Sequence, residues 1–226
     1  MIAGGDEAGR GCVIGPMVIC VYGCKEENEK ELKKLGVKDS KELSQIQRLR
    51  IRKIIEEKGI YEIRIVRVKE INEMMNTFTL NEIEEKAFKE ASDKLYKKIK
   101  FDKLIYDSPD VKPERFAAKL KMPGVEVIAL HKADALHPVV SAASVIAKLT
   151  REEEVQKIKD ETGIDFGSGY SSDPITIKTL QEQKNNKQFL EFARIHWSTF
   201  AKHTGINVKE RKVKAHKKSE GLGKWI

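Results

Sequence analysis

The chain has 226 residues, the length of one sizeable domain, alone or with a smaller helical addition. Hydrophobic residues make up 40% of it and charged residues 35%, enough apolar content for a core beneath a heavily charged surface. The apolar segments are short and interrupted by charges, which argues against a transmembrane helix, and the N-terminus lacks the basic and apolar regions of a secretory signal.

The three cysteines, Cys12, Cys20 and Cys24, are an odd number in apolar surroundings and form no C-x-x-C pair. They therefore indicate neither a disulfide framework nor a zinc site. Buried thiols in a reducing compartment explain them best, so we expect a cytoplasmic protein.

The net charge of +8 is concentrated at the C-terminus, where residues 209–226 hold seven Lys or Arg against two Glu. A basic, flexible tail of this kind indicates either a polyanionic partner, most often nucleic acid, or simply a solvated terminus. No spare apolar stripe is visible in the sequence, so we expect a monomer.

The first part of the chain predicts three strands. An opening strand leads to the acidic pair Asp6 and Glu7, and a short glycine-containing link joins it to a strand over residues 13–22. The short link favours an antiparallel hairpin. Charged helices over residues 26–35 and 45–58 and an alternating strand over residues 61–68 follow.

The middle of the chain predicts a parallel pair of strands. Helices over residues 69–75 and 80–99, the second capped by Thr79, precede a strand at 103–107, a helix at 113–121 and a strand at 125–130. A strand–helix–strand unit of this kind is right-handed with parallel strands. We therefore predict an α/β fold with a mixed five-stranded sheet flanked by helices.

A long helix over residues 138–158 is expected next, followed by a Gly/Ser-rich boundary at 163–174 and helices over 175–183 and 189–203. The predicted division is a catalytic domain at 1–174, a C-terminal helical region at 175–208 and the tail at 209–226.

Four acids follow or end predicted strands: Asp6 and Glu7, Asp107, and Asp134. In open α/β sheets, sites form at the carboxyl ends of the strands, so these side chains should converge on one edge. Four crowded carboxylates need cations to stay ionised together, and hard oxygen ligands suit Mg²⁺ or Mn²⁺. Two such ions are the usual device for phosphodiester hydrolysis. Taken singly, Asp107 could instead be a turn acid and Asp134 a helix N-cap.

The glycines around Arg10 allow backbone N–H groups to approach a ligand closely, and an arginine between glycines is placed for a phosphate. Alternatively, residues 4–11 are a charged hairpin turn.

The whole set of motifs resembles ribonuclease HII, in its archaeal form. The stretch Gly-Gly-Asp-Glu-Ala-Gly-Arg-Gly at residues 4–11 is similar to the signature of that family. Further matches follow in order at residues 37–41, 106–107, 132–134, 141–151 and 167–174, so the resemblance covers roughly residues 1–175.

The resemblance implies a ribonuclease-H-like fold with a C-terminal helical part. It implies a ribonuclease H that cuts the RNA strand of RNA–DNA hybrids and incises 5′ to single ribonucleotides in duplex DNA, leaving 3′-hydroxyl and 5′-phosphate ends. Two-metal-ion catalysis by Mg²⁺ or Mn²⁺ would use the metal-binding catalytic acids Asp6, Glu7, Asp107 and Asp134.

The resemblance also implies substrate-binding residues. Gly9, Arg10 and Gly11 would read the ribose 2′-hydroxyl largely through backbone groups, and Tyr170 would stack on the next deoxyribose. Ser40, Lys41 and Lys148 would hold phosphates. Without the resemblance, Tyr170 could be a packed boundary residue and Lys41 a solvated surface lysine.

The chain departs from the family pattern at three positions. Cys12 and Ser171 stand where the family usually has proline, and Gly5 replaces a branched apolar residue before the acidic pair. None of these changes removes a predicted metal ligand.

Residues 219–226 resemble a degenerate clamp-binding box, in which Leu222, Trp225 and Ile226 would insert into a sliding clamp. The usual first glutamine is absent, and Ile226 replaces the second aromatic residue. Exposed aromatic anchors suit partner pockets, but Trp225 could also fold back onto the body of the protein.

Two other functions fit parts of the pattern. A different nuclease on the same fold, such as ribonuclease HIII, usually has an extra N-terminal domain, and a motif that starts at residue 4 leaves no room for one. A hybrid-binding module without activity would need a broken set of acids, whereas all four acids are present.

Overall fold

Five strands form one mixed sheet in the order β3-β2-β1-β4-β5. The computed structural model describes residues 1–34 and 45–208. The strands are β1 (Ile2–Ala8), β2 (Met17–Cys24), β3 (Gly59–Val66), β4 (Lys103–Asp107) and β5 (Glu126–Leu130). The neighbours β1–β2 and β2–β3 are antiparallel, and β1–β4 and β4–β5 are parallel. The predicted mixed sheet, its hairpin and its parallel pair are therefore confirmed.

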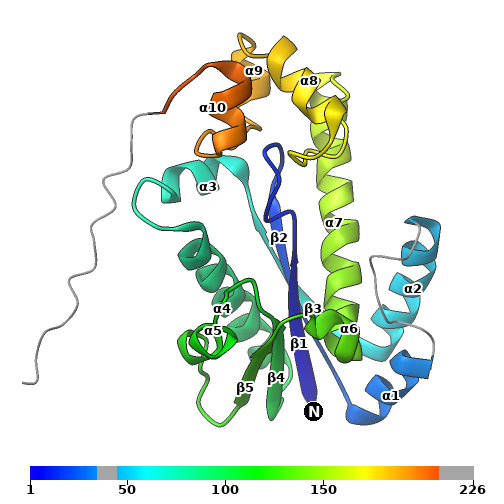
Figure 1. Ribbon diagram of the computed structural model, residues 1–226. Coiled ribbons are helices and arrows are strands. Elements are labelled where there is room, and N and C mark those ends of the chain that lie inside the picture. The colour runs from blue at the N-terminus through cyan, green and yellow to red at the C-terminus, as the bar shows by residue number, and fades with distance from the viewer. Residues whose placement is uncertain (35–44, 209–226) are drawn as a thin grey trace, which may run out of the picture.

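Helices cover both faces of the sheet (Figure 1). One face packs against α1 (Glu26–Lys34), α2 (Gln45–Lys58) and the long α7 (Pro138–Thr162). The other packs against α3 (Val68–Met74), α4 (Leu80–Lys98) and α5 (Pro113–Lys119). Every residue of β2 is buried, as expected for a central strand covered on both faces.

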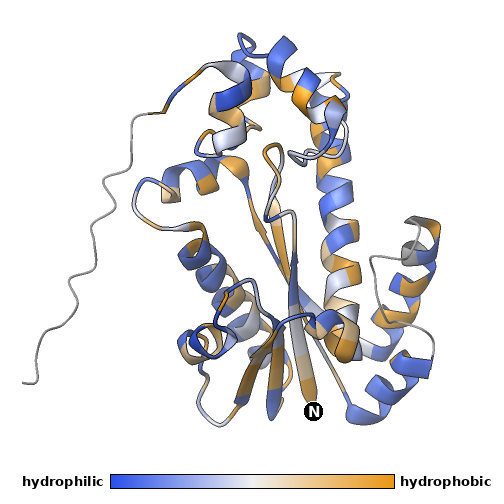
Figure 2. Cartoon of the chain, in the orientation of Figure 1, coloured by the Kyte–Doolittle hydropathy of each residue, from blue (hydrophilic) through white to orange (hydrophobic). Residues whose placement is uncertain are grey.

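The remaining helices are short: α6 (Ala133–Leu136), α8 (Pro174–Glu182), α9 (Lys187–Leu190) and α10 (Ser198–Thr204). The last three gather at the end of α7 that lies away from the N-terminus (Figure 1). Apolar residues concentrate on the strands and on inward helix faces, while outer turns are hydrophilic (Figure 2). None of the helices in the described ranges is both long and apolar enough to cross a membrane.

The start of α4 follows its predicted chemistry. The Thr79 side chain accepts the backbone N–H of Glu82, and the Glu82 carboxylate accepts the backbone N–H of Thr79 at 2.7 Å. This reciprocal capping box satisfies donors that the first helical turn leaves open.

The prediction of one helix over residues 189–203 is wrong. That segment holds the end of α9, an irregular stretch and then α10. The irregular stretch bonds to the tip of the β1–β2 hairpin: Arg194 N–H donates to Val13 O at 2.8 Å, and Gly15 N–H donates to Phe192 O at 3.0 Å. The predicted strand at 13–22 also starts later, at Met17, because the tip pairs with these distant segments.

The departure at Gly5 is explained by Tyr106. A Cβ on Gly5 would lie 2.7 Å from the Tyr106 ring, which therefore occupies the room of the missing side chain. The ring is held from both ends, since its hydroxyl lies 2.6 Å from Ser92 Oγ and Phe88 packs edge-on at 5.2 Å. The strand before the acidic pair is thus closely packed without a branched residue.

We predict that Gly5→Val destabilises the fold by about 1–3 kcal/mol, because a side chain would be forced into a filled site. Chemical denaturation with the Gly11→Ala control would measure this, since a Cβ at Gly11 meets nothing within 4 Å. Combining Gly5→Val with Tyr106→Ala should cost less than the sum of the two single changes. Additive costs would contradict the packing explanation.

Candidate active site

The sheet brings the first three predicted acids to one edge. Asp6 and Glu7 lie near the end of β1, opposite Cys20 and Ile19 of β2. In the parallel β4, Tyr106 pairs with Gly5, so the next residue, Asp107, ends its strand beside Asp6. The acidic pair lies within the last part of the strand and not beyond its end.

The fourth acid, Asp134, lies in α6, directly after β5. Lys132 caps this helix in the left-handed conformation (φ 57°), an unusual conformation for a residue with a Cβ. The turn directs the backbone N–H of Ala133 to Asp107 Oδ1, at 2.7 Å. The hydrogen bond fixes α6, and with it buried Asp134, against the end of β4.

The acids raise one another's pKa values. Burial raises the pKa of Asp6 well above its usual range, with the charges of Glu7 and Asp107 adding to the effect and a hydrogen bond from Ser144 opposing it. Burial, followed by the charges of Glu84 and Asp107, raises the pKa of Glu7 to about 8. Without a cation, these groups therefore cannot all be ionised at neutral pH.

The donor set fits a hard divalent cation. All four predicted ligands offer carboxylate oxygens, and Glu7 Oε2 is buried without a hydrogen-bond partner. Within residues 1–34 and 45–208, no three carboxylate, thiol or imidazole groups are already gathered into a metal-binding arrangement.

Sequence reasoning missed a fifth acid, Glu84 of α4. Its side chain is fully buried, and Arg10 Nε donates to its Oε2 at 3.0 Å. Burial raises the pKa of Glu84 to about 7, although Arg10 lowers it. Arg10 Nη2 also donates to Asn81 Oδ1 at 2.6 Å. The Arg10 side chain therefore binds α4. Its flanking glycines had instead suggested a side chain directed at a phosphate.

The Gly9–Gly11 loop lies against Tyr170. Val13 and Ile14 both donate backbone N–H groups to Gly169 O, at 2.9 and 3.1 Å, and the Gly9 backbone forms a hydrogen bond with the Tyr170 side chain. Gly9 has φ 82°, and a Cβ there would lie 2.6 Å from Arg151. Only glycine fits this position without strain.

Arg151 also contacts the tyrosine. Its guanidinium lies 4.7 Å from the centre of the Tyr170 ring, and its Nη2 donates to Ser168 O at 2.6 Å. Tyr170 keeps 37% of its surface exposed, so it is anchored yet still accessible to a ligand.

A second residue missed from the sequence is Arg194, which is completely buried. Its guanidinium donates to three backbone carbonyls of the hairpin: Gly15 O at 3.0 Å, Arg10 O at 2.9 Å and Gly9 O at 2.7 Å. Burial lowers its pKa to about 10, which leaves it charged at neutral pH. Sequence reasoning placed this residue inside a helix, where nothing distinguished it from a surface arginine.

The other predicted substrate residues are less informative. Lys148 is half-buried on α7, and Gly11 is exposed at the loop. Ser40 and Lys41 lie outside the described residues.

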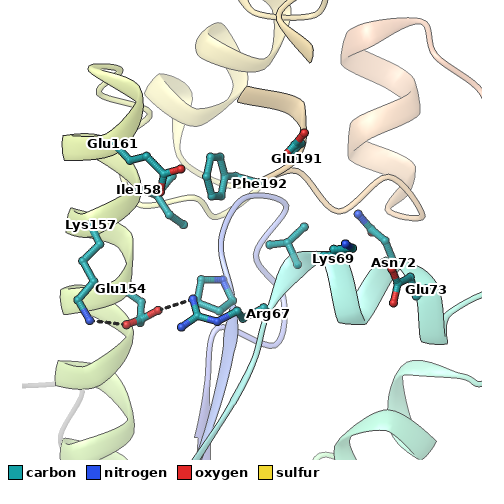
Figure 3. Close-up of a pocket in the computed structure, with 12 residues that line it drawn as sticks. Arg67, Lys69, Asn72, Glu73, Glu154, Lys157, Ile158, Glu161, Glu191 and Phe192 are labelled. Carbon is teal, nitrogen blue, oxygen red and sulfur yellow. Dashed lines mark hydrogen bonds and ion pairs between the residues drawn. The ribbon is translucent and has the colours of Figure 1, made fainter. Parts of the chain in front are cut away.

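One cavity lies away from the acids. It has a volume of about 590 Å³ and lies beside Pro16 at the hairpin tip, between α3, α7 and Phe192 (Figure 3). Glu154 on its wall accepts hydrogen bonds from Arg67 at 3.1 Å and Lys157 at 2.6 Å. None of the predicted site residues lines it, so the acids form a site at the sheet edge, separate from this cavity.

The mixed sheet, its helical layers and its acidic edge define a ribonuclease-H-like protein. The crystal structure of ribonuclease H2 from Pyrococcus horikoshii has a TM-score of 0.80 at 42% identity, covering 90% of this chain and 97% of that one. The ribonuclease HII of a PCNA complex from Archaeoglobus fulgidus has a TM-score of 0.79 at 42% identity, covering 88% and 95%. A Mn²⁺ complex of Bst-RNase HIII, at 22% identity and a TM-score of 0.78, shares the fold.

The sequence comparison makes the family definite. The family model for ribonuclease HII matches residues 3–200, and ribonuclease HII of Methanocaldococcus jannaschii is 45% identical over 214 residues, covering 88% of this chain and 93% of that protein. The chain belongs to the ribonuclease HII family and is therefore a hydrolytic, metal-dependent endoribonuclease.

The raised carboxyl pKa values predict a pH-dependent stability for the metal-free protein. A carboxyl whose pKa is higher in the folded state keeps its proton after the unfolded chain has lost it, so it favours folding at low pH. That contribution is lost as the pH rises from about 4.5 through the folded pKa of Glu7, about 8. Melting temperatures in a chelator should therefore fall over this range, and a divalent cation should restore them at pH 8.

The matched variant is Glu7→Gln, which cannot ionise. Its stability relative to the unmodified protein should improve as the pH rises toward 8. A difference that stays constant across this range would contradict the assignment to Glu7.

Proposed function

We propose that this protein hydrolyses the RNA strand of RNA–DNA hybrids and also incises duplex DNA on the 5′ side of single ribonucleotides, leaving 3′-hydroxyl and 5′-phosphate ends. The observation that carries the proposal is the contact between two parts of the site. The loop of Gly9, Arg10 and Gly11 follows the acidic pair directly in the sequence and lies against Tyr170.

In this proposal the acids form the part of the site that cleaves the phosphodiester bond. Asp6, Glu7, Asp107 and Asp134 would hold two divalent cations, Mg²⁺ or Mn²⁺. When bound, such ions activate a water nucleophile and stabilise the charge on the leaving oxygen. The protein contributes the fixed positions: β1 and β4 hold three carboxylates side by side, and the Ala133–Asp107 hydrogen bond fixes α6 with the fourth.

In this proposal the loop and Tyr170 distinguish ribose from deoxyribose. The 2′-hydroxyl is the group that separates RNA from DNA at a given site. Backbone N–H groups of Arg10 and Gly11 can approach such a hydroxyl closely, and the partly exposed ring of Tyr170 offers a flat surface to the neighbouring deoxyribose. The departure at Cys12 is compatible with this arrangement, since Cys12 pairs with Tyr170 through a backbone bridge.

The same reasoning supports a division of labour along the chain. We assign catalysis to residues 1–174 and a supporting role to the helical region at 175–208, with Lys148 and the pair Ser40 and Lys41 as phosphate contacts. The helical region contributes Arg194, which binds the sugar-reading loop from behind.

A duplex with one embedded ribonucleotide tests the proposal. We expect a single cut on the 5′ side of the ribonucleotide in Mg²⁺ or Mn²⁺, no cut in a chelator, and no cut in the matching all-DNA duplex. An RNA–DNA hybrid should be cut at several positions. If the ribonucleotide duplex stays whole with either metal, the proposed incision activity is wrong.

Asp134→Asn separates chemistry from folding in this test. The variant keeps the size of the side chain but removes a charged metal ligand, so cleavage should be lost while duplex binding is largely retained. If binding and the melting temperature fall together with cleavage, Asp134 has a structural role instead.

We also propose that the tail binds a sliding clamp. The Archaeoglobus fulgidus relative was crystallised in a complex with PCNA. Leu222, Trp225 and Ile226 would supply the anchors here; they lie outside the described residues. Deleting residues 219–226 should abolish binding to the clamp in a pull-down assay while hybrid cleavage continues. Unchanged clamp binding would reject the proposal.

A further inference from the structure

The side chain of Arg10 points into the protein, although its backbone belongs to the sugar-reading loop. Arg10 Nε donates to Glu84 Oε2 at 3.0 Å, and Nη2 donates to Asn81 Oδ1 at 2.6 Å. Both partners lie in the first two turns of α4, about 70 residues along the chain. Two nitrogen atoms of one rigid guanidinium therefore join the centre of the loop to α4, the helix that packs against β2 and β3.

Burial makes a partner for Glu84 necessary. Glu84 is 0% exposed, and a carboxylate in such surroundings needs a cation or a proton. Arg10 supplies the cation while its own side chain stays 33% exposed. Because Glu84 sits on a helix whose N-terminus is fixed by the capping box, it offers the arginine a stationary partner.

The backbone of the loop is fixed from the other side. Arg194 binds the carbonyls of Gly9 and Arg10, at 2.7 and 2.9 Å. In a trans peptide the carbonyl and the following N–H point in opposite directions, and no described peptide is cis. The N–H groups of Arg10 and Gly11 therefore point away from Arg194. The loop is therefore held at two points: Arg194 binds its carbonyls, and the Arg10 side chain binds α4.

We propose that Glu84 is a positioning residue for ribose selection: by holding the Arg10 side chain, it fixes the backbone N–H groups of Arg10 and Gly11 in the orientation that recognises a 2′-hydroxyl. This inference rests on the proposed function of the loop. It gives Arg10 an indirect role, since its guanidinium binds the protein and its backbone faces the sugar.

The competing interpretation makes Arg10 a phosphate contact that Glu84 only stores between substrates. The two interpretations predict different changes when Glu84 loses its charge. A released phosphate-binding arginine would alter the affinity for every duplex alike, because all duplexes carry phosphates. A displaced backbone would alter only the affinity that depends on the 2′-hydroxyl.

The experiment compares two duplexes that differ by one ribonucleotide. Their affinities are measured by fluorescence anisotropy at one salt concentration, with Ca²⁺ and in the Asp134→Asn background so that no cleavage occurs. We expect the starting protein to prefer the ribonucleotide duplex. Glu84→Gln should reduce this preference about tenfold, the effect of weakening one charged hydrogen bond, and leave the affinity for the all-DNA duplex unchanged.

Glu85→Gln is the matched control. Glu85 is the next residue on the same helix, is similarly buried and carries the same charge, but its partner is Lys119, at 2.7 Å. This variant should keep the full preference. Asn81→Ala provides a second test, because it removes only the 2.6 Å contact with Arg10 and disturbs packing less than a change at fully buried Glu84. It should also reduce the preference.

The outcomes distinguish a failure of the proposed function from a failure of this inference. If the starting protein shows no preference for the ribonucleotide duplex, the proposed function of the loop fails. If the starting protein shows the preference and both Glu84→Gln and Asn81→Ala retain it, the loop does not need the contact between Arg10 and α4 to recognise the ribose. The inference is then wrong. An equal change of affinity for both duplexes would support the phosphate interpretation and would overturn the inference. Melting temperatures identify a variant that fails to fold, and the other variant then decides.

Discussion

Electrostatic repulsion among buried carboxylates is the constraint on which the site depends. Burial favours the neutral form of Asp6, Glu7 and Glu84, and Asp6 and Glu84 are almost completely removed from water. Neighbouring carboxylates act in the same direction, since Glu7 and Asp107 raise the pKa of Asp6, and Glu84 and Asp107 raise that of Glu7. A fold that gathers these groups must therefore supply positive charge or hydrogen-bond donors at close range, and much of the surrounding structure consists of such groups.

Arg10 provides part of that compensation, and it is one of three arginines that link the hairpin to the rest of the protein. Arg10 pairs with Glu84, Arg151 lies over the ring of Tyr170, and Arg194 binds the carbonyls of the loop. A buried arginine is costly unless its donors are satisfied, and fully buried Arg194 meets this requirement with three backbone carbonyls. The hairpin between β1 and β2 is thereby fixed to α4, α7 and the segment before α10. A loop that reads a ligand through backbone groups needs this rigidity, because it has no long side chains that could adjust.

The sequence allowed prediction of the elements whose signals are local. Alternating or continuous apolar runs predicted the five strands, and Thr79 as an N-cap predicted the start of α4. The four acids could be located because each follows or ends a strand. Glu84 and Arg194 could not be found in this way. Both are charged residues in stretches that look like ordinary charged helices, and only contacts over 70 or more residues bury them. The break between α9 and α10 was missed for the same reason, since its backbone groups bond to the hairpin tip.

The position of Glu84 connects the two halves of the site. Its carboxylate is the charge that acts most strongly on Glu7, and its partner Arg10 lowers the pKa of Glu7 in return. A change that moves Arg10 would therefore alter both the orientation of the loop and the charge around Glu7, a proposed metal ligand. The proposed sugar reading and cation binding would then share one charged network, although different atoms would perform them. In such a network the affinity for a cation and the preference for a ribose would be thermodynamically linked, and linkage is reciprocal.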